Sequence, residues 1–460
     1  MHVRRHRRAR RPGPQAGRRL RLRRLPQRSV EGDRPAVALR LRRGRGQALA
    51  KEVRLRGRHA HGRARGRPVR DGRAGARRGR RAPGEVEAGR PLVPLREVPG
   101  GGRAHADARP PRRQGAQGVT LLGLALREAV KGRARELGFD AVAVGPAGPP
   151  PHAGAFERWL AAGYAATMDY LERGSADRGD PERLLPGCRS VIAVALSYAR
   201  EDDEPGWRGV ARYARGHDYH ELMRPRLAAL AEFVCAAAGA DVRCRVAVDT
   251  SAILERDVAA RAGLGWVGKN TNLLATGLGS YFFIGVVLTT AALPADEGQP
   301  DRCGTCTACL DACPTRAFVA PYVLDARRCI AYLTIEHRGD VPEELREGIG
   351  EWLFGCDVCQ EVCPWTRKAR PGRDAALAPA GPLGPLEALL DLDRDAFRAR
   401  FRHTPLWRAK RAGLLRNAAL VLGNRGDARA APALERALDD EDEAVRHAAA
   451  WALERVRRLE

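Results

Sequence analysis

Hydrophobic positions follow a regular pattern only from about residue 120 onward. Apolar residues at helical spacing over 121–139 predict a helix, and the short apolar run that follows is typical of a strand. The same patterns recur along the chain, with strands expected at 141–145, 190–199, 243–249 and 281–290 and helices at 224–239 and 252–262. Strands that alternate with helices in this way predict an α/β layer.

The C-terminal region is predicted to be entirely helical. It follows a loop-rich segment at 303–365 and a linker rich in Pro, Gly and Ala at 371–385. Within it, the sequence LRNAA at 415–419 returns after 30 residues as VRHAA at 445–449. This repeat resembles one and a half HEAT-type helical hairpins, which are too few to be stable alone and are expected to dock on the α/β layer. An ordinary pair of amphipathic helices is the alternative.

The first 118 residues have a composition of their own. They contain 36 Lys plus Arg against 8 Asp plus Glu, whereas the remaining residues contain 45 against 47. The formal net charge of +26 therefore belongs to this segment alone. It has no Phe, Tyr, Trp or Cys, and Gly and Pro interrupt its apolar runs, so it is predicted to be disordered. It is either an Arg-rich arm that binds RNA or, as we favour, the product of a gene model that begins too far upstream.

No segment approaches the roughly 18 consecutive apolar residues that a membrane span requires. The arginines near the N-terminus precede no apolar stretch of the kind found in a secretion signal. We therefore expect a cytoplasmic protein without a membrane partner.

Eight of the 11 cysteines lie between residues 303 and 363. The first four follow the spacing C-x2-C-x2-C-x3-C-P, which is the bacterial ferredoxin signature for 4Fe-4S clusters. In that signature the fourth Cys binds the other cluster, so the two ligand sets are predicted to cross. The first set is Cys303, Cys306, Cys309 and Cys363, and the second set is Cys313, Cys329, Cys356 and Cys359.

Zinc is the main alternative for paired C-x-x-C motifs, but the spacing of the first run is not one that zinc sites use. Disulfides are not expected in a reducing cytosol. Cys188, Cys235 and Cys244 lie on apolar elements and are expected to be buried as small hydrophobic residues rather than to act as ligands.

A glycine-rich segment, GLGWVGKN at 263–270, matches G-x-G-x-x-G and nearly matches a P-loop. Its context excludes both, because a helix rather than a strand precedes the glycines and because Asn270 occupies the position of the magnesium-binding hydroxyl. Two explanations remain open for the glycines. They form a helix C-cap and a turn, or they allow a large ligand to approach the backbone closely.

Several long motifs occur in an order that resembles the epoxyqueuosine reductase family from about residue 119 to 460. They are DTSAILER at 249–256, AGLGWVGKNT at 262–271, the two cysteine motifs, YLTIEHRG at 332–339 and HTPLWRAKRAGLLRNAALVLGN at 403–424. One departure is Ala252, where the family commonly has Pro. The first 118 residues have no counterpart in the family.

The resemblance implies an α/β cobalamin-binding body at 119–300 with an inserted two-cluster ferredoxin-like domain at 301–370. A C-terminal all-α HEAT-like repeat at 385–460 would bind tRNA, and the segment 1–118 would be a disordered Arg-rich N-terminal extension. The implied reaction reduces epoxyqueuosine to queuosine at the wobble position of a tRNA anticodon. The implied cofactors are two 4Fe-4S clusters and a cobalamin. The chain has no D-x-H-x-x-G motif to supply a lower axial His, and the resemblance implies that the cobalamin binds base-off without such a ligand.

Site residues carried over from the family are expectations. Asp249 matches the proton donor, and a partly apolar pocket is expected to favour its protonated carboxyl; its alternative is to cap the helix at 252–262. The cobalamin contacts would be Tyr213, Arg215, Asp218, Tyr219, His220, Gly263, Gly265, Trp266, Gly268, Lys269, Asn270, Gly279 and Ser280. Ordinary strand ends and turns would use the same residue types.

A group of basic residues in the C-terminal region is interleaved with an aromatic residue, as a tRNA backbone contact requires. The predicted contacts are Arg402, His403, Arg408, Lys410, Arg411, Arg416 and Asn417. A solvated helix face is the alternative. Besides tRNA, we expect an external electron donor such as a flavodoxin or a ferredoxin, and we expect a monomer.

Two rival functions remain. A ferredoxin-like electron carrier would need only the cysteine-rich insert and would leave the α/β body without a task. A reductive dehalogenase-like corrinoid enzyme would share the cofactors but is normally exported with a twin-arginine signal, which this sequence does not show.

Overall fold

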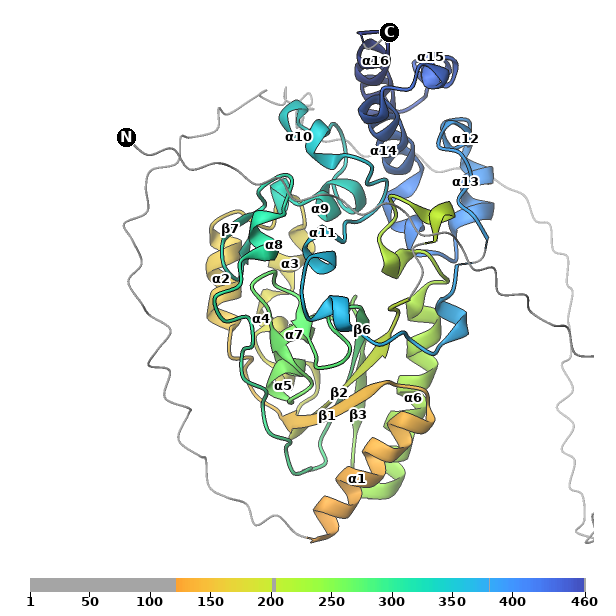
Figure 1. Ribbon diagram of the computed structural model, residues 1–460. Coiled ribbons are helices and arrows are strands. Elements are labelled where there is room, and N and C mark those ends of the chain that lie inside the picture. The colour runs from red at the N-terminus through yellow and green to blue at the C-terminus, as the bar shows by residue number, and fades with distance from the viewer. Residues whose placement is uncertain (1–120, 201–203, 380, 459–460) are drawn as a thin grey trace, which may run out of the picture. The chain divides into compact units, whose positions relative to one another are not determined.

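The computed structural model describes residues 121–200, 204–379 and 381–458 (Figure 1). The Arg-rich segment 1–118, with its predicted disorder, lies outside the described residues. Among the described residues, no helix combines the length and the apolar character that crossing a membrane requires.

A four-stranded sheet in the order β1-β2-β6-β3 forms the centre of the body. Its strands are β1 (Ala141–Pro146), β2 (Ser190–Ser197), β3 (Cys244–Ala247) and β6 (Phe282–Thr289), close to the predicted positions. All three strand pairs are antiparallel, although strands that alternate with helices are more typical of parallel sheets. Every residue of β2 is buried, because helices cover both faces of the sheet.

Helices α1 (Leu121–Glu136) and α6 (Tyr219–Ala238) cover one face of the sheet, as Figure 1 shows. Helix α7 (Glu255–Arg261) covers the other face and approaches β1 closely. A Cβ atom at Gly145 would lie 2.5 Å from the Cα of Ala262, so only glycine fits there. The body is completed by α2 (Ala153–Ala161), α3 (Asp169–Arg173), α4 (Ser175–Arg178), α5 (Pro181–Leu184), β4 (Trp266–Val267) and β5 (Leu273–Leu274).

The cysteine-rich insert consists mainly of loops with short elements. These are α8 (Ala308–Asp311), β7 (Phe318–Ala320), β8 (Val323–Leu324), α9 (Ile330–Ile335), α10 (Glu343–Ile349) and α11 (Val358–Glu361). Between the insert and the body, the hairpin β4–β5 lies against the insert through Trp266 and Leu274, which share a small apolar cluster with Cys363.

The C-terminal region is helical, as predicted. It contains α12 (Glu387–Leu390), α13 (Arg394–Phe401), the 3-10 helix η6 (Pro405–Ala409), α14 (Lys410–Arg425), α15 (Ala431–Ala437) and α16 (Glu443–Arg458). Leu415 and Ala418 on α14 and their repeat partners Val445 and Ala448 on α16 are buried in one core. The 30-residue repeat therefore places equivalent apolar positions of α14 and α16 against each other.

The C-terminal region docks mainly on the helical part of the insert rather than on the sheet. Its core is continuous with Leu333 of α9 and Ile349 of α10 and includes Trp207 and Val210 of the body. Figure 1 shows α14 beside α9 and α10. This differs from the expected docking on the α/β layer, because both faces of the sheet are already covered.

Arg416 and Asn417 lie inside this contact. Their exposed fractions are 1% and 0%. Arg416 donates to the carbonyl oxygens of Leu333 at 2.6 Å, Gly339 at 2.7 Å and His337 at 3.1 Å. Burial lowers the pKa of Arg416 to about 10. The prediction that these two residues contact tRNA is wrong, because their side chains are enclosed and bonded to backbone groups of the insert.

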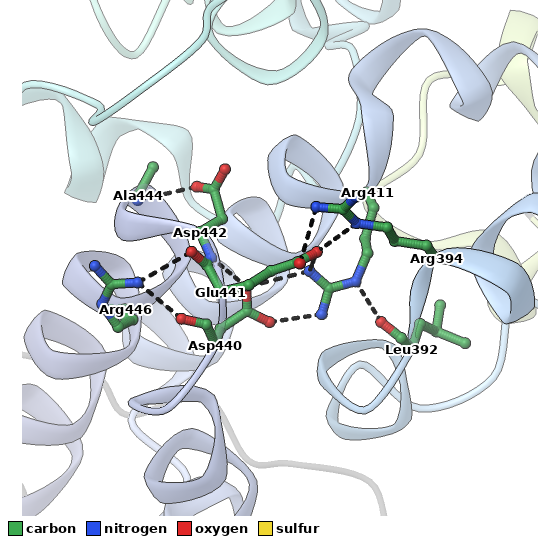
Figure 2. Close-up of polar contacts among 8 residues, drawn as sticks. All are labelled: Leu392, Arg394, Arg411, Asp440, Glu441, Asp442, Ala444 and Arg446. Atoms are coloured by element: carbon green, nitrogen blue, oxygen red, sulfur yellow. Dashed lines mark hydrogen bonds and ion pairs between the residues drawn. The ribbon is translucent and has the colours of Figure 1, made fainter.

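An acidic turn between α15 and α16 fixes Arg411 in the same way (Figure 2). The guanidinium of Arg411 contacts both carboxylate oxygens of Asp440, at 2.6 and 3.1 Å, and its Nε donates to the Leu392 carbonyl. In the same network Arg394 of α13 contacts Glu441 with two hydrogen bonds of 2.8 and 2.9 Å. Arg411 was predicted to contact tRNA, but its side chain is only 16% exposed and joins the helices of the C-terminal region instead.

Replacing Arg416 with Met should destabilise the protein. Met has a similar length but no donors, so the carbonyl groups of Leu333, His337 and Gly339 would lose their buried partner. We expect the free energy of unfolding to fall by about 3 kcal/mol, measured by denaturant unfolding of anaerobic protein. The control is Arg402→Met at an exposed position of the same region. An equal effect of both substitutions would contradict the structural role of Arg416.

Candidate active site

Asp249 lies just after β3, and three separate segments hold it. Its carboxylate Oδ2 is 3.4 Å from His220 Nε2 and 3.4 Å from a guanidinium nitrogen of Arg408. Its backbone N–H donates to the side chain of Glu255. Its φ is +47°, a conformation that is uncommon for a residue other than glycine and is frequent at functional sites. Helix α7 begins only at Glu255 and has Leu254 at its N-cap, so the helix-capping alternative for Asp249 is wrong.

Contacts with Asp218 and Tyr219 fix the orientation of the His220 imidazole. Asp218 is the N-cap of α6 and accepts hydrogen bonds from the backbone N–H of His220 at 2.9 Å and from its Nδ1 at 2.8 Å. The ring of Tyr219 stacks on the imidazole, with a centroid distance of 4.2 Å, and also on Phe283 of β6. The imidazole therefore has one nitrogen bound to Asp218 and the other directed at Asp249.

The corner at 402–410 lies beside this site. Arg408 of η6 bridges Asp249 and Glu336, and the His403 ring contacts Glu221 of α6 at 2.9 Å. Arg402 and Lys410 are exposed, and the ammonium group of Lys410 lies 5.4 Å from the ring centre of Trp407. Of the seven predicted tRNA contacts, Arg408 reaches Asp249, and Arg402, His403 and Lys410 lie on the same corner, whereas Arg411, Arg416 and Asn417 are engaged in other contacts.

The charges around Asp249 set its protonation state. Burial works to raise the pKa of Asp249, but the hydrogen bond with His220 and the charge of Arg408 leave it below its ordinary value. Burial lowers the pKa of His220, yet its bonds with Asp218 and Asp249 raise it to about 9. Burial, reinforced by Asp249, raises the pKa of Glu255 to about 8. In the protein alone, Asp249 therefore favours the carboxylate rather than the expected protonated form.

Sequence reasoning did not single out Glu255 and Glu336. Both lie within motifs that carried the family resemblance, DTSAILER and YLTIEHRG, so a signal was present. Their spacing gave no reason to connect them with Asp249, because Glu336 lies 87 positions further along the chain. The fold brings Glu336 to Asp249 through Arg408, and it brings the Glu255 side chain to the backbone N–H of Asp249.

The glycines of the 263–279 segment are required by contacts within the chain. A Cβ atom at Gly265 would lie 1.9 Å from the Leu274 carbonyl oxygen, and one at Gly279 would lie 2.5 Å from the Thr366 Cα. A Cβ atom at Gly263 would likewise lie too close to the backbone of Glu297, and one at Gly268 too close to the side chain of Leu274. The cavity beside Gly263 has a volume of about 160 Å³, below the ~300–1,000 Å³ of ordinary ligand sites. These contacts explain the small residues without a bound ligand.

The polar residues of the same segment hold the cysteine-rich insert in place. Lys269 donates to the carbonyl oxygens of Gly304 and Cys306, at 2.7 and 2.9 Å. Asn270 donates to the Cys359 carbonyl at 3.2 Å, and Ser280 donates to Gln360 at 2.8 Å. Of the predicted cobalamin contacts, the structure gathers Tyr213, Asp218, Tyr219 and His220 near Asp249. Trp266 is buried beneath the insert, and Arg215 is buried with its Nε bonded to the Val210 carbonyl.

Contacts among the cysteines of the insert support the two predicted groups, since Cys363 shares a small apolar cluster with Cys303. Burial raises the pKa of the Cys309 thiol, and the charges of Cys303, Cys363 and Cys306 raise it further. Burial also raises the pKa of Cys356, with further contributions from Cys329 and Cys313. The pKa of Cys359 is raised by burial and then by Cys356 and Cys329. Cys363 thus lies with the first motif and not with its neighbours in the sequence, as the crossed ligation requires.

Donor groups surround these thiols as a cluster would need. The backbone N–H of Ala317 donates to the Cys313 sulfur at 3.3 Å, and the Asn272 amide lies 4.0 Å from the Cys359 sulfur. The buried Trp266 Nε1 has no hydrogen-bond partner among the described residues, and its interaction with the Cys303 thiol opposes the effect of burial on the pKa of that thiol. No three metal-binding side chains in the described ranges are close enough to share a single ion. The thiol-rich donor set fits two 4Fe-4S clusters.

The three remaining cysteines lie away from the insert. Cys188 donates to the Ser190 carbonyl and Cys244 to the Thr289 hydroxyl, at the edge of the sheet. Burial raises the pKa of both thiols, that of Cys244 to about 12. A neutral, half-buried thiol is the form expected of a structural cysteine.

Comparison with known proteins matches each part of this arrangement. The family model "Epoxyqueuosine reductase QueG, DUF1730" matches residues 178–250, which include Tyr213 to His220 and Asp249. The epoxyqueuosine reductase of Pseudomonas aeruginosa is 42% identical over 341 residues, covering 72% of this chain and 94% of the relative. The chain belongs to the epoxyqueuosine reductase family. The enzyme of Xanthomonas campestris pv. campestris is 43% identical and covers 64% of this chain and 86% of its own length.

Models of a 4Fe-4S double cluster binding domain and of HEAT repeats match residues 302–366 and 408–459. A solved epoxyqueuosine reductase with an epoxyqueuosine-modified tRNA-Tyr stem loop is 33% identical, with a TM-score of 0.66, over 72% of this chain and 90% of its own. A Bacillus subtilis epoxyqueuosine reductase, 32% identical over the same shares with a TM-score of 0.64, is described with an aspartate catalytic loop swung out of the active site. Epoxyqueuosine reductases are oxidoreductases, and the two-cluster insert and HEAT-like region of this chain are confirmed.

The crossed cysteine groups can be tested by substitution in pairs. Cys363→Ala should remove the same spectroscopic cluster signal as Cys309→Ala, and Cys356→Ala should remove the other signal. Electron paramagnetic resonance of the reduced protein distinguishes the two, and the parent protein should contain about eight iron atoms. Cys188→Ala, which changes no predicted ligand, is the control. If Cys363→Ala and Cys356→Ala remove the same signal, the crossed ligation is wrong.

Proposed function

We propose that this protein reduces epoxyqueuosine to queuosine in tRNA and that Asp249 delivers a proton to the departing oxygen. The observation that carries the proposal is the position of Asp249. It is strained, held by three segments and placed beside a basic corner that can receive a tRNA loop. The catalytic aspartate loop in the description of the Bacillus subtilis relative supports the same role.

The reaction sets the chemical demands on the site. Conversion of an epoxide to an alkene consumes two electrons and two protons and releases the oxygen as water. The oxygen leaves as a strong base unless an acid protonates it, so a positioned proton donor lowers the barrier. The side chain of Asp249 is 42% exposed and can therefore reach a substrate that docks from the surface.

Cobalamin would bind against the wall made by Tyr213, Asp218, Tyr219 and His220. One polar atom in this region, the Tyr281 hydroxyl, is buried without a hydrogen-bond partner among the described residues, which fits a site completed by a ligand. When bound, cobalamin supplies a cobalt centre that accepts single electrons and transfers them to carbon. The predicted cobalamin contacts in the 263–280 segment would act indirectly, by holding the insert against the body. They are Gly263, Gly265, Trp266, Gly268, Lys269, Asn270, Gly279 and Ser280.

The two cluster groups provide the route for electrons. Cys306 is exposed, so the first group lies near the surface, where an external flavodoxin or ferredoxin could donate. Helix α8, which carries Cys309, contacts α11, which carries Cys359, and this supports two neighbouring groups. Electrons would enter at the first group and pass to the second. The identity of the donor, the monomeric state and the cytoplasmic location stay predictions.

tRNA would bind at the corner formed by Arg402, His403, Arg408 and Lys410. Arg402 and Lys410 make no ion pair with another described residue, so their charges are available to phosphate groups. Arg408 is engaged with Asp249 and Glu336 and would orient the anticodon loop near the carboxylate.

Asp249→Asn tests the catalytic role. Asn has nearly the same size but cannot transfer a proton, so we expect single turnover of epoxyqueuosine tRNA to slow by roughly 100- to 10,000-fold. The binding of cobalamin, clusters and tRNA should stay the same. Asp241→Asn, at an exposed loop position, is the control. A rate within a few-fold of the parent protein would exclude Asp249 as the donor.

The tRNA surface can be tested by its salt dependence. Replacing Arg402 and Lys410 together with Ala should weaken tRNA binding and reduce the slope of log K against log salt by about 2, roughly one for each phosphate group that is no longer neutralised. Arg429→Ala is the matched control, because Arg429 is exposed but paired with Asp427 in another turn. An unchanged slope in the double variant would assign these two residues to a solvated face.

A further inference from the structure

His220 occupies a position that the proton delivery by Asp249 leaves unexplained. Its Nδ1 is bound to Asp218 at 2.8 Å, and its Nε2 is buried 3.4 Å from Asp249 Oδ2. The stacked ring of Tyr219 fixes the plane of the imidazole. The three groups therefore form a line, carboxylate, imidazole, carboxylate, with the exposed end at Asp249.

Charged groups face this line from every neighbouring element. The carboxyl groups are Asp218 on α6, Asp249 after β3, Glu255 on α7 and Glu336 after α9, and the cations are Arg224 on α6, Arg256 on α7 and Arg408 on η6. The neutral hydroxyls of Tyr170, Tyr213 and Tyr219 and the His403–Glu221 pair complete the surroundings. The two carboxylates in direct contact with the imidazole, Asp218 and Asp249, stabilise its protonated form.

The protonation states create a difficulty for the reaction. The pKa of Asp249 is below its ordinary value, because the bond with His220 and the charge of Arg408 outweigh the effect of burial, so near neutral pH it holds no proton to give. The bonds with both carboxylates outweigh burial and raise the pKa of His220 to about 9, so His220 does hold one. Asp249, the group that would face the substrate, is thus deprotonated, and its neighbour His220 is protonated.

We propose that His220 is the proton reservoir of this site and that Asp249 is the group through which its proton reaches the substrate. This inference rests on the proposed function. The N–H bond of His220 Nε2 breaks as an O–H bond forms on Asp249, and that O–H bond breaks as the departing oxygen is protonated. The imidazole is left neutral, with its remaining proton on Nδ1 and hydrogen-bonded to Asp218. Solvent supplies the second proton of the released water and reprotonates the imidazole after turnover, and both electrons still come through the clusters.

Glu255 is the competing reservoir, because burial raises its pKa to about 8. Its contact is with the backbone N–H of Asp249, however, and not with the carboxylate. His220 is the group whose nitrogen faces the carboxylate oxygen directly.

The first test compares pH profiles of single turnover for the parent protein and His220→Gln, both with cobalamin and clusters bound. In the parent, the rate should hold up to a pH of about 9 and fall above it, since His220 loses its proton there. In His220→Gln, only the small protonated fraction of Asp249 can act. We expect a loss of roughly 100-fold or more at neutral pH that recovers toward the parent rate as the pH falls to about 5.

The matched control is His217→Gln, which changes an exposed histidine three positions away and should leave the profile unchanged. If His220→Gln keeps the parent profile, the reservoir inference fails and Glu255 takes its place. If its rate is low but does not recover in acid, His220 serves only to shape the site, and the inference also fails.

The second test does not depend on turnover. Nuclear magnetic resonance of labelled histidine in the oxidised protein should show the His220 imidazole, assigned by its absence from His220→Gln, titrating well above the ordinary 6.5, and Asp249→Asn should shift that titration downward. If His220 titrates in the ordinary range, the reservoir inference is overturned while the proposed function stands. If Asp249→Asn instead turns over at the parent rate, the proposed role of Asp249 fails first.

Discussion

The burial of Arg416 beneath α9 is the interaction on which the geometry of the site depends. Its guanidinium binds the carbonyl oxygens of Leu333, His337 and Gly339, which fixes the loop after α9 against α14. That loop carries Glu336, which contacts Arg408, and Arg408 in turn contacts Asp249. A chain of charged contacts therefore connects the helical C-terminal region to the carboxylate in the body. A buried arginine is costly unless its donors are satisfied, and here backbone carbonyls and Asn417 satisfy them.

The glycine-rich segment after α7 has a comparable structural role on the other side of the insert. Its glycines allow the β4–β5 hairpin to close on itself, and Lys269 and Asn270 then bind backbone carbonyls next to Cys306 and Cys359. The insert is thus held from two sides, by the hairpin and by α14. This matters because electrons move between the clusters and the substrate site only if the distance between them is kept short.

The sequence predicted the strands well, because each is a continuous apolar run bounded by polar or turn residues. The pairing of Cys363 with the first cysteine motif stays a prediction, which the packing of Cys363 beside Cys303 supports. The sequence did not predict the antiparallel sheet, because an apolar run carries no direction. The tRNA assignments failed at Arg411, Arg416 and Asn417, because arginines that bind buried carbonyls or an internal acid look the same in sequence as arginines that bind phosphate. The carboxylate form of Asp249 could not be foreseen either, since it depends on His220 and Arg408, which approach from distant parts of the chain.

The crossed grouping of the cysteines bears on the order in which the protein matures. Each group contains thiols from both ends of the insert, and Cys363, the last of them, belongs with the first motif. If the predicted ligand sets hold, the second set is complete only when the ribosome has passed residue 359, and the first set only at residue 363. A nascent chain therefore cannot load one cluster and then the other in sequence order. Iron and sulfide must be delivered to an insert that has already been fully synthesised, so loading of the clusters and folding of the insert form a single late step in biogenesis.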